Sequence, residues 1–250
     1  MIPIDFAGKT VLVTGGTRGI GRGISRLFAE AGASTIAIYR SNEESARVSL
    51  TEREAHGGIH RNYRCDVSQE AEVSALCSQV LADVDGKIDF LVLNSARIPG
   101  GASIQDTSLS DWHTTMDNNL TSAFLLTRAF LPHVPRGGAV VGVASGAGHL
   151  GLPGLSVYGA SKAGLILFCE ALAQDYGPKG IRVNVVSPGS TDSSYQGDPS
   201  ADEAEPRSSK DNALRRGGTP LDVARAVLFF CSDLSGFVTG QWLRVNGGVV

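Results

Sequence analysis

One short stretch near the N-terminus decides the fold: Thr14-Gly15-Gly16-Thr17-Arg18-Gly19-Ile20-Gly21. An apolar run of strand length, residues 10–14, leads into it, and helically spaced apolar residues follow over 19–31. Small residues let the backbone approach a phosphate closely, and the free N–H groups at a helix N-terminus attract anions. The stretch therefore predicts a strand-to-helix turn that binds phosphate groups.

Strand-length apolar runs alternate with longer helical patterns along the whole chain. Strands are expected at residues 10–14, 34–39, 59–65, 88–93, 139–144, 181–186 and 242–245. Helices are expected at residues 19–31, 42–56, 68–83, 109–131, 157–176 and 222–231, with Ser68 as the cap of the third. This alternation favours a parallel sheet covered by helices. The sequence predicts a single-domain α/β Rossmann fold over residues 1–250, with a doubly wound, mostly parallel sheet of about seven strands and helices on both faces.

The composition excludes several classes of protein. Hydrophobic residues make up 42% of the chain and charged residues 19%, which excludes a disordered chain. The 22 basic and 25 acidic residues give a net charge of −3 with no basic stripe, so nucleic acid is not an expected partner. The apolar runs are too short to span a bilayer, and the N-terminus lacks the pattern of a signal peptide. We therefore expect a cytoplasmic protein with no membrane partner.

Metal sites and disulfides are not expected either. The four cysteines lie far apart without a CxxC pair, and we interpret them as reduced core residues: Cys65, Cys77, Cys169 and Cys231. No group of His, Asp and Glu has the spacing of a metal site. Four scattered histidines are expected at the surface, namely His56, His60, His113 and His133.

One segment departs from the alternation. Residues 190–209 follow the sixth predicted strand, are rich in Ser, Asp, Glu and Pro, and show little periodicity. A long loop in a compact domain is usually a functional lid or a disordered segment, and its place at the carboxyl end of a strand favours a lid. We predict a substrate lid at about residues 190–214, with Tyr195 as a candidate contact.

Three residues in the second half have the chemistry of an acid–base site. Tyr158 and Lys162 lie four apart in a helical pattern, so both side chains project from one face. A cation beside a phenol favours the phenolate and lowers the phenol pKa, which makes a proton donor and acceptor. Ser145 follows a predicted strand, and its hydroxyl can polarise the same carbonyl oxygen that the phenol contacts.

Together these motifs resemble the short-chain dehydrogenase/reductase family over nearly the whole chain, from Gly8 to Gly248. The glycine turn and the Tyr-x-x-x-Lys pattern carry most of the resemblance. Further matching segments are Asp66-Val67, Asn94-Ser95-Ala96, Asn119-Leu120, Asn184, Pro188-Gly189, residues 218–224 and residues 239–248. The resemblance implies a catalytic tetrad of Asn119, Ser145, Tyr158 and Lys162. It also implies that Asn119 holds a water behind the lysine.

The resemblance further implies a nicotinamide cofactor. The positions that it assigns to cofactor binding are Gly15, Thr17, Arg18, Gly19, Ile20, Gly21, Tyr39, Arg40, Asp66, Val67, Asn94, Ser95, Ala96, Tyr158, Lys162, Pro188, Gly189 and Thr191.

The end of the second predicted strand indicates which nicotinamide is used. NAD-binding sheets usually place a carboxylate there for the ribose hydroxyls, whereas this chain has Tyr39 followed by Arg40. Arg18 lies in the glycine turn, and arginine makes bidentate phosphate contacts. In the family this arginine pair marks members that prefer NADP(H). We therefore expect NADP(H) to be preferred over NAD, and Arg40→Asp to reverse the preference.

The substrate side departs from the family pattern. Ser95 and Arg97 stand in Asn94-Ser-Ala-Arg97, where the family has Asn-Asn-Ala-Gly. Arg97 either faces an anionic group of the substrate or points to solvent. His149 either lines the pocket or is a loop histidine without a role. The candidate substrate contacts are Arg97, Ala147, His149, Leu150 and Tyr195.

The pattern most resembles 3-oxoacyl-carrier-protein reductases and the ketoreductases of secondary metabolism, so we predict an NADPH-dependent carbonyl reductase. An NAD(P)-dependent alcohol, sugar or steroid dehydrogenase is the alternative, because the same residues serve both directions. A cofactor sensor without catalytic activity is a third hypothesis. Enoyl reduction is less favoured, because that branch spaces its tyrosine and lysine more widely. The resemblance also implies a homotetramer, or a dimer, acting on a small ketone or alcohol that a carrier protein could present.

Overall fold

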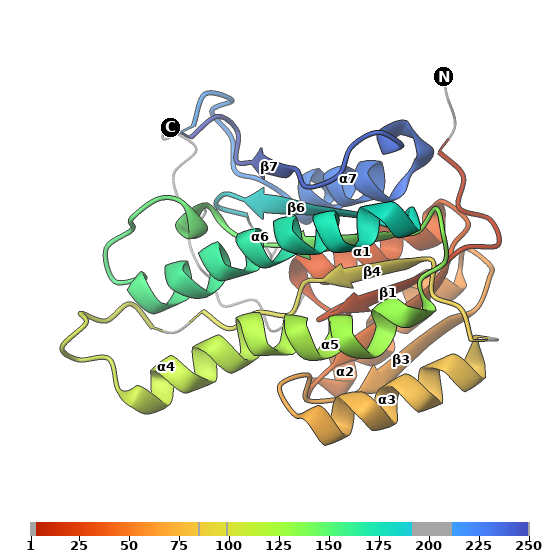
Figure 1. Ribbon diagram of the computed structural model, residues 1–250, viewed down its shortest axis with the longest axis horizontal. Helices are drawn as coiled ribbons and strands as arrows, with labels where there is room; N and C mark the ends of the chain where they lie inside the picture. Colours follow the sequence, from red (N-terminus) through yellow and green to blue (C-terminus); the bar gives the residue numbers. More distant parts are fainter. Residues whose placement is uncertain (1–3, 85, 99, 192–211, 250) are drawn as a thin grey trace.

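The computed structural model describes residues 4–84, 86–98, 100–191 and 212–249. Within these residues one parallel sheet of seven strands has the order β3-β2-β1-β4-β5-β6-β7 (Figure 1). The strands are β1 (Thr10–Thr14), β2 (Ser34–Tyr39), β3 (His60–Arg64), β4 (Phe90–Leu93), β5 (Ala139–Val143), β6 (Arg182–Pro188) and β7 (Trp242–Val245). The predicted Rossmann fold is confirmed.

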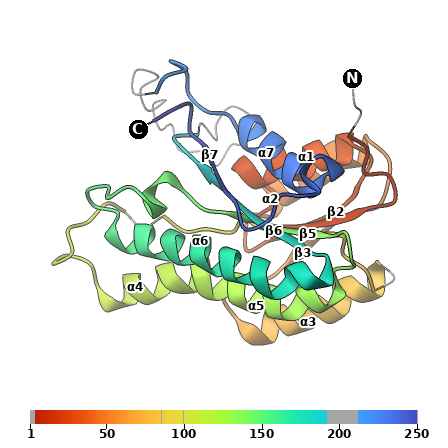
Figure 2. The same ribbon diagram turned by 45° about the horizontal axis from the view of Figure 1, so that its top comes forward.

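Helices cover both faces of the sheet, as Figure 2 shows. One face carries α1 (Gly19–Glu30), α2 (Glu43–Glu54) and α7 (Pro220–Cys231). The other carries α3 (Glu70–Asp83), α4 (Leu109–Met116), α5 (Ser122–Phe130) and α6 (Ser156–Tyr176). No helix in the described part of the chain is long and apolar enough to cross a membrane.

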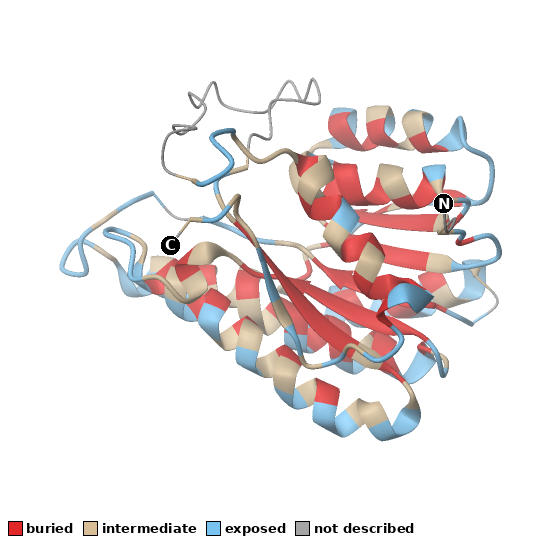
Figure 3. Cartoon of the chain, turned by 90° about the horizontal axis from the view of Figure 1, so that it is seen from above, coloured by how far each residue is buried: buried red, intermediate tan, exposed pale blue. Residues whose placement is uncertain are grey.

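The strands form here because their side chains alternate between two cores. In β1, Leu12 packs into the core under α3, α5 and α6, whereas Val11 and Val13 pack into the core under α1 and α7. A strand buried on both faces reads as a continuous apolar run, as the sequence of β4 does. The buried strands between the two helical layers are visible in Figure 3.

The order of the strands in the sheet indicates where a ligand would bind. β1 pairs with β2 on one side and with β4 on the other, so the strand order reverses beside β1. Ligands of doubly wound sheets bind outside the carboxyl ends of the strands at such a point. The glycine turn follows β1, and Asn94 follows β4.

Three expectations from the sequence are corrected. The helix predicted over 109–131 is interrupted by a π-helical segment, Asp117–Thr121, between α4 and α5. Ser68 does not cap α3, because its amide and hydroxyl both donate to Asp66 Oδ1, and the helix starts after Gln69. His60 is buried rather than exposed, because its ring bonds to Thr35 Oγ1 at 2.8 Å and to the carbonyl of Gly57.

Candidate active site

The glycine turn forms a close backbone cradle. Gly15 and Gly19 have φ values of +61° and +49°, a region that residues with a Cβ rarely adopt. A Cβ on Gly21 would lie 2.0 Å from the carbonyl oxygen of Gly15. The turn is tied to the end of β4, because the amides of Asn94 and Ser95 both donate to Thr14 Oγ1 at 3.0 Å. These positions therefore need glycine, which lets the start of α1 pack closely against the end of β1.

A cleft of about 570 Å³ opens above this turn. Predicted cofactor residues that line it are Gly15, Thr17, Arg18, Gly19, Ile20, Gly21, Tyr39, Arg40, Asp66, Val67, Asn94, Ser95, Ala96 and Thr191. The cleft does not include the other four, Tyr158, Lys162, Pro188 and Gly189. Lining residues that the sequence analysis did not assign to the cofactor are Ile38, Ser41, Asn42, Cys65, Arg97, Ile98 and Asn118. The cleft has the size and position expected of a dinucleotide site.

The acid–base residues lie just after β5 and on α6. Ser145 follows β5 and accepts a hydrogen bond from the amide of Ala147 at 3.2 Å. Tyr158 and Lys162, one turn apart on α6, are 6% and 1% exposed. Lys162 Nζ lies 5.9 Å from the centre of the Tyr158 ring and donates to the carbonyl of Val143 at 2.9 Å. The helix therefore brings the phenol and the amine to one buried place, as predicted.

The ionisation of this pair differs from the expectation. Burial raises the pKa of the Tyr158 phenol, and the Ser145 side chain opposes this rise only partly. Burial lowers the pKa of Lys162 to about 8. The lysine does not lower the phenol pKa in this arrangement, because its ammonium faces the Val143 carbonyl and lies several ångströms from the ring. Burial of this site therefore favours the neutral form of the Tyr158 phenol.

Asn119 lies in the π-helical segment and is 1% exposed. Its Oδ1 accepts from the amide of Arg97 at 2.7 Å, and its Nδ2 donates to the carbonyl of Arg97 at 3.0 Å. The same Nδ2 donates to Ser161 Oγ at 2.9 Å, and Ser161 donates to the carbonyl of Tyr158. Asn119 thus links the loop after β4 to the helix that carries Tyr158. Its predicted role in holding a water stays a prediction.

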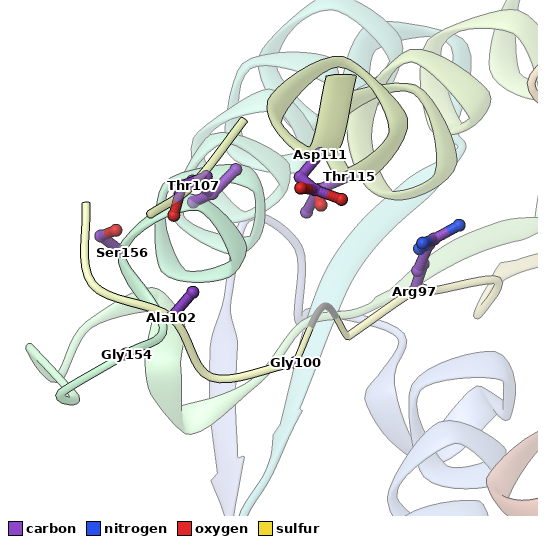
Figure 4. A pocket seen from close by; sticks show the side chains of 9 residues that line it. Arg97, Gly100, Ala102, Thr107, Asp111, Thr115, Gly154 and Ser156 are labelled. Carbon is purple, nitrogen blue, oxygen red and sulfur yellow. The ribbon is translucent and has the colours of Figure 1, made fainter. Parts of the chain in front are cut away.

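A smaller pocket of about 260 Å³ lies beside the cleft, between the loop after β4, α4 and the start of α6 (Figure 4). Arg97 lines both spaces. Its side chain is exposed and forms no ion pair within the part of the chain described. Asp111 and Thr115 on α4 line the same pocket (Figure 4). A polar substrate group would meet charged and hydroxyl side chains here.

The other predicted substrate residues lie elsewhere or outside the described residues. Ala147 is buried and Leu150 half-buried in the segment after Ser145. The His149 ring packs 4.5 Å from the Trp242 ring, and neither of its nitrogens has a hydrogen-bond partner among the described residues. Burial, and to a lesser extent Arg244, lowers the His149 pKa. Tyr195 and most of the predicted lid, 192–211, lie outside the described residues.

The described residues fit a nicotinamide dinucleotide. The cleft lies over the glycine turn and continues along the ends of β2, β3 and β4, where a dinucleotide binds in sheets of this kind. Across residues 4–84, 86–98, 100–191 and 212–249, no group of three His, Cys, Asp or Glu side chains could hold a metal ion. The four cysteines are free and buried, as expected.

Comparison with known proteins decides the family. A family model described as Enoyl-(Acyl carrier protein) reductase matches residues 15–250. The 3-oxoacyl-acyl-carrier-protein reductase FabG of Chlamydia pneumoniae is 38% identical over 248 residues, which cover 98% of each chain. This chain is a short-chain dehydrogenase/reductase.

Other members of this family are similar over the same length. The 3beta-hydroxysteroid dehydrogenase 1 of Eggerthella lenta is 34% identical over 250 residues, covering 98% of this chain and 95% of that protein. A short-chain dehydrogenase from Burkholderia cenocepacia, solved in complex with NADP, is 31% identical with a TM-score of 0.89, and the match covers 98% of each chain. As a short-chain dehydrogenase/reductase, the protein is an oxidoreductase that acts on CH–OH or C=O groups and uses NAD(P)(H).

Proposed function

We propose that this short-chain dehydrogenase/reductase is an NADPH-dependent carbonyl reductase. The observation that carries the proposal is the buried Tyr158 phenol, which lies one helical turn from the buried Lys162 amine and next to Ser145. A protonated phenol donates a proton, which is what a carbonyl oxygen needs as it becomes an alcohol. A phenolate would instead favour removal of a proton from an alcohol.

The preference for NADPH over NADH rests on the adenosine end of the cleft. Arg18 and Arg40 line it, and Tyr39 stands where NAD-binding sheets usually have an acid. Guanidinium groups bind phosphate in a bidentate manner, and the 2′-phosphate is the group that distinguishes the two cofactors. The similar Burkholderia cenocepacia protein was solved with NADP, which agrees with this preference.

In the proposed mechanism the reduced cofactor supplies the hydride for the carbonyl carbon. Ser145 hydrogen-bonds to the carbonyl oxygen and orients it, and Tyr158 transfers its phenolic proton to that oxygen. Lys162, whose amine lies 5.9 Å from the centre of the Tyr158 ring, would supply positive charge near the phenol as the proton leaves and would hold the ribose of a bound cofactor. Asn119 holds the loop after β4 against α6, so the acid–base residues keep a fixed place relative to the cleft.

Arg97 is the residue we propose for substrate recognition. Its backbone amide donates to Asn119 Oδ1 and its carbonyl accepts from Asn119 Nδ2, and its side chain lines both the cleft and the smaller pocket. A carboxylate, phosphate or phenolate on the substrate would pair with it. Carrier-protein-bound β-ketoacyl groups are candidate substrates, because the name of the similar FabG protein states that substrate class.

We also propose a homotetramer in the cytoplasm, with a dimer as the alternative. Large apolar side chains are exposed on three helices that cover one face: Leu109 and Trp112 on α4, Phe124 on α5, and Leu167 on α6. Surfaces of this kind are commonly buried between subunits. Light scattering at micromolar concentration tests this, and a monomer would contradict it.

Two other chemistries are alternatives. Oxidation of a secondary alcohol is supported by the steroid dehydrogenase relative, and it would require Tyr158 to act as a base. Enoyl reduction is named in the description of the matching family model, whereas the three residues between Tyr158 and Lys162 favour the carbonyl branch.

A panel of ketones and β-ketoacyl thioesters with NADPH tests the proposal. We expect cofactor oxidation with some members of the panel, and a loss of about 10²–10⁴-fold in Tyr158→Phe, because the proton donor is removed. Cofactor affinity measured by nicotinamide fluorescence should remain. Retained turnover in Tyr158→Phe would exclude the mechanism, and NADPH binding without turnover of any substrate, alcohols included, would favour the sensor hypothesis.

A further inference from the structure

Arg64 ends strand β3 directly beside the end of β2. Parallel pairing sets Arg64 opposite Tyr39, the residue before Arg40. Its Nε donates to the carbonyl oxygen of Arg40 at 3.1 Å. Its Nη1 lies 3.6 Å from Glu43 Oε1 in the first turn of α2. Arg64 therefore holds the backbone of Arg40 from the side of the sheet edge.

Asn118 holds the other end of Arg40. Arg40 Nη1 donates to Asn118 Oδ1 at 3.3 Å, and Asn118 Nδ2 donates to the carbonyl of Thr114 at 2.8 Å, which fixes the orientation of the amide. The Nε and Nη2 groups of Arg40 form no hydrogen bond within the described residues. These two N–H groups make one side of the guanidinium fork, so Arg40 is held with a phosphate-binding edge free.

The charges around Arg40 also favour a phosphate. Arg18 lines the same cleft, and Arg64 adds a third guanidinium behind Arg40. Carboxylates near the site would oppose a phosphate, namely Asp66, which lines the cleft, and Glu43, with which Arg64 pairs. Both partners of that pair are largely exposed, so the ion pair itself adds little stability. Its effect is on the local potential, where an unpaired carboxylate would repel a doubly charged phosphate.

We propose that Arg64, together with Asn118, positions Arg40 for the 2′-phosphate of NADP(H) and so determines the cofactor preference. Arg64 does not line the cleft, and it acts through Arg40. An arginine that is already ordered loses less conformational freedom when the phosphate binds. NADH lacks this phosphate, so its affinity gains nothing from the ordering. The proposal rests on the NADPH preference proposed above.

The test is a fluorescence titration of the purified protein with NADPH and with NADH. In Arg64→Met we expect the Kd for NADPH to rise by about 2- to 10-fold, the range for a long side chain that the ligand must now order. The Kd for NADH should change by less than about twofold. Asn118→Ala should give the same pattern. Arg61→Met is the matched control, because it removes the same charge from the same strand at an ion pair with Asp83.

A double-mutant cycle shows whether Arg64 acts through Arg40. In an Arg40→Gln background the Arg64→Met change should no longer weaken NADPH binding, because its effect depends on Arg40. An equal loss in both backgrounds, an equal loss for NADPH and NADH, or no loss would overturn the proposal. The Arg40→Asp variant tests the proposed NADPH preference separately from the role of Arg64. If Arg40→Asp leaves the NADPH-to-NADH ratio unchanged, the NADPH preference itself fails.

Discussion

The buried charge of Lys162 should lower the free energy of unfolding, although the proposed mechanism needs this residue. The amine is 1% exposed, and no ion pair reaches it from the residues described. Burial lowers its pKa from 10.5 to about 8, which at about 1.4 kcal/mol per pH unit corresponds to about 3 kcal/mol at pH 7. Lys162→Met removes this cost, loses a hydrogen bond to Val143 worth about 1 kcal/mol, and keeps the side-chain length. We expect a net stabilisation of about 2 kcal/mol.

The sign with pH follows from linkage. The folded pKa of Lys162 is depressed, so between about pH 8 and pH 10.5 the unfolded state binds more protons than the folded state. The wild type therefore gains stability relative to Lys162→Met as the pH rises through this window. The difference between the two proteins should be largest at and below pH 7 and should shrink towards pH 10.5.

Thermal and urea unfolding at several pH values measure this difference. At neutral pH the Tm of Lys162→Met should rise by about 4–8 °C, since 1 kcal/mol shifts the Tm of a chain of this size by about 2–4 °C. Reductase activity should fall by at least about 100-fold. The exposed Lys179→Met is the control; it loses a cation–π contact with Tyr176, so the expected change is a loss of at most about 1 kcal/mol. A destabilised Lys162→Met, or a difference that does not depend on pH, would refute the reasoning.

Three further changes test other parts of the structure. Gly21→Ala places a Cβ 2.0 Å from the Gly15 carbonyl oxygen. We therefore expect a free energy of unfolding lower by about 1–3 kcal/mol and NADPH binding weaker by at least about tenfold. The control is Gly177→Ala, which has open space around its Cβ and should bind NADPH normally. Asp222→Ala removes the capping box of α7 and the Arg216 ion pair, and unfolding should show a loss of about 1–2 kcal/mol at neutral pH. Because Arg216 holds the pKa of Asp222 well below its usual range, this loss should shrink on acidification; an effect that is independent of pH would contradict the assignment. Arg97→Ala should raise the KM of an anionic ketone with little change in kcat, and an unchanged KM would exclude its substrate role.

The sheet could be predicted from the sequence because its strands are short, continuous apolar runs. Thr10–Thr14, Ser34–Tyr39 and Trp242–Val245 have the predicted boundaries. β4 is shorter than predicted: Ile88 and Asp89 are buried, but the ladder pairing with β1 and β5 begins at Phe90. Burial produces the apolar pattern, and sheet pairing then fixes where the ladder starts.

The π-helical segment could not be predicted, because one extra residue in a helix turn barely changes the spacing of apolar residues. The break falls at Asp117–Thr121 and contains Asn118 and Asn119. It lets these neighbouring amides serve two elements: Asn118 reaches Arg40, and Asn119 reaches Arg97 and Ser161. The sequence analysis found Asn119 through the family resemblance and missed Asn118, which no motif marks.

Buried polar groups were also missed, because their partners are distant in sequence. Arg53 on α2 is fully buried, and it donates to Thr35 Oγ1 at 2.6 Å and to Asn62 on β3. Burial lowers the pKa of this arginine to about 10. His60 joins the same network through Thr35. The local sequence around these residues is polar, and polar residues are mostly exposed, so the sequence pattern gave no reason to expect burial.

The most direct test of the account is a titration of the purified protein with NADPH and NADH, followed by turnover of the ketone panel with the tighter cofactor. We predict that NADPH binds at least about tenfold more tightly than NADH, since the 2′-phosphate meets two lining guanidinium groups, and that NADPH is consumed with a ketone. Equal or tighter NADH binding would contradict the cofactor assignment. Turnover that survives in Tyr158→Phe would contradict the central claim that this phenol delivers the proton.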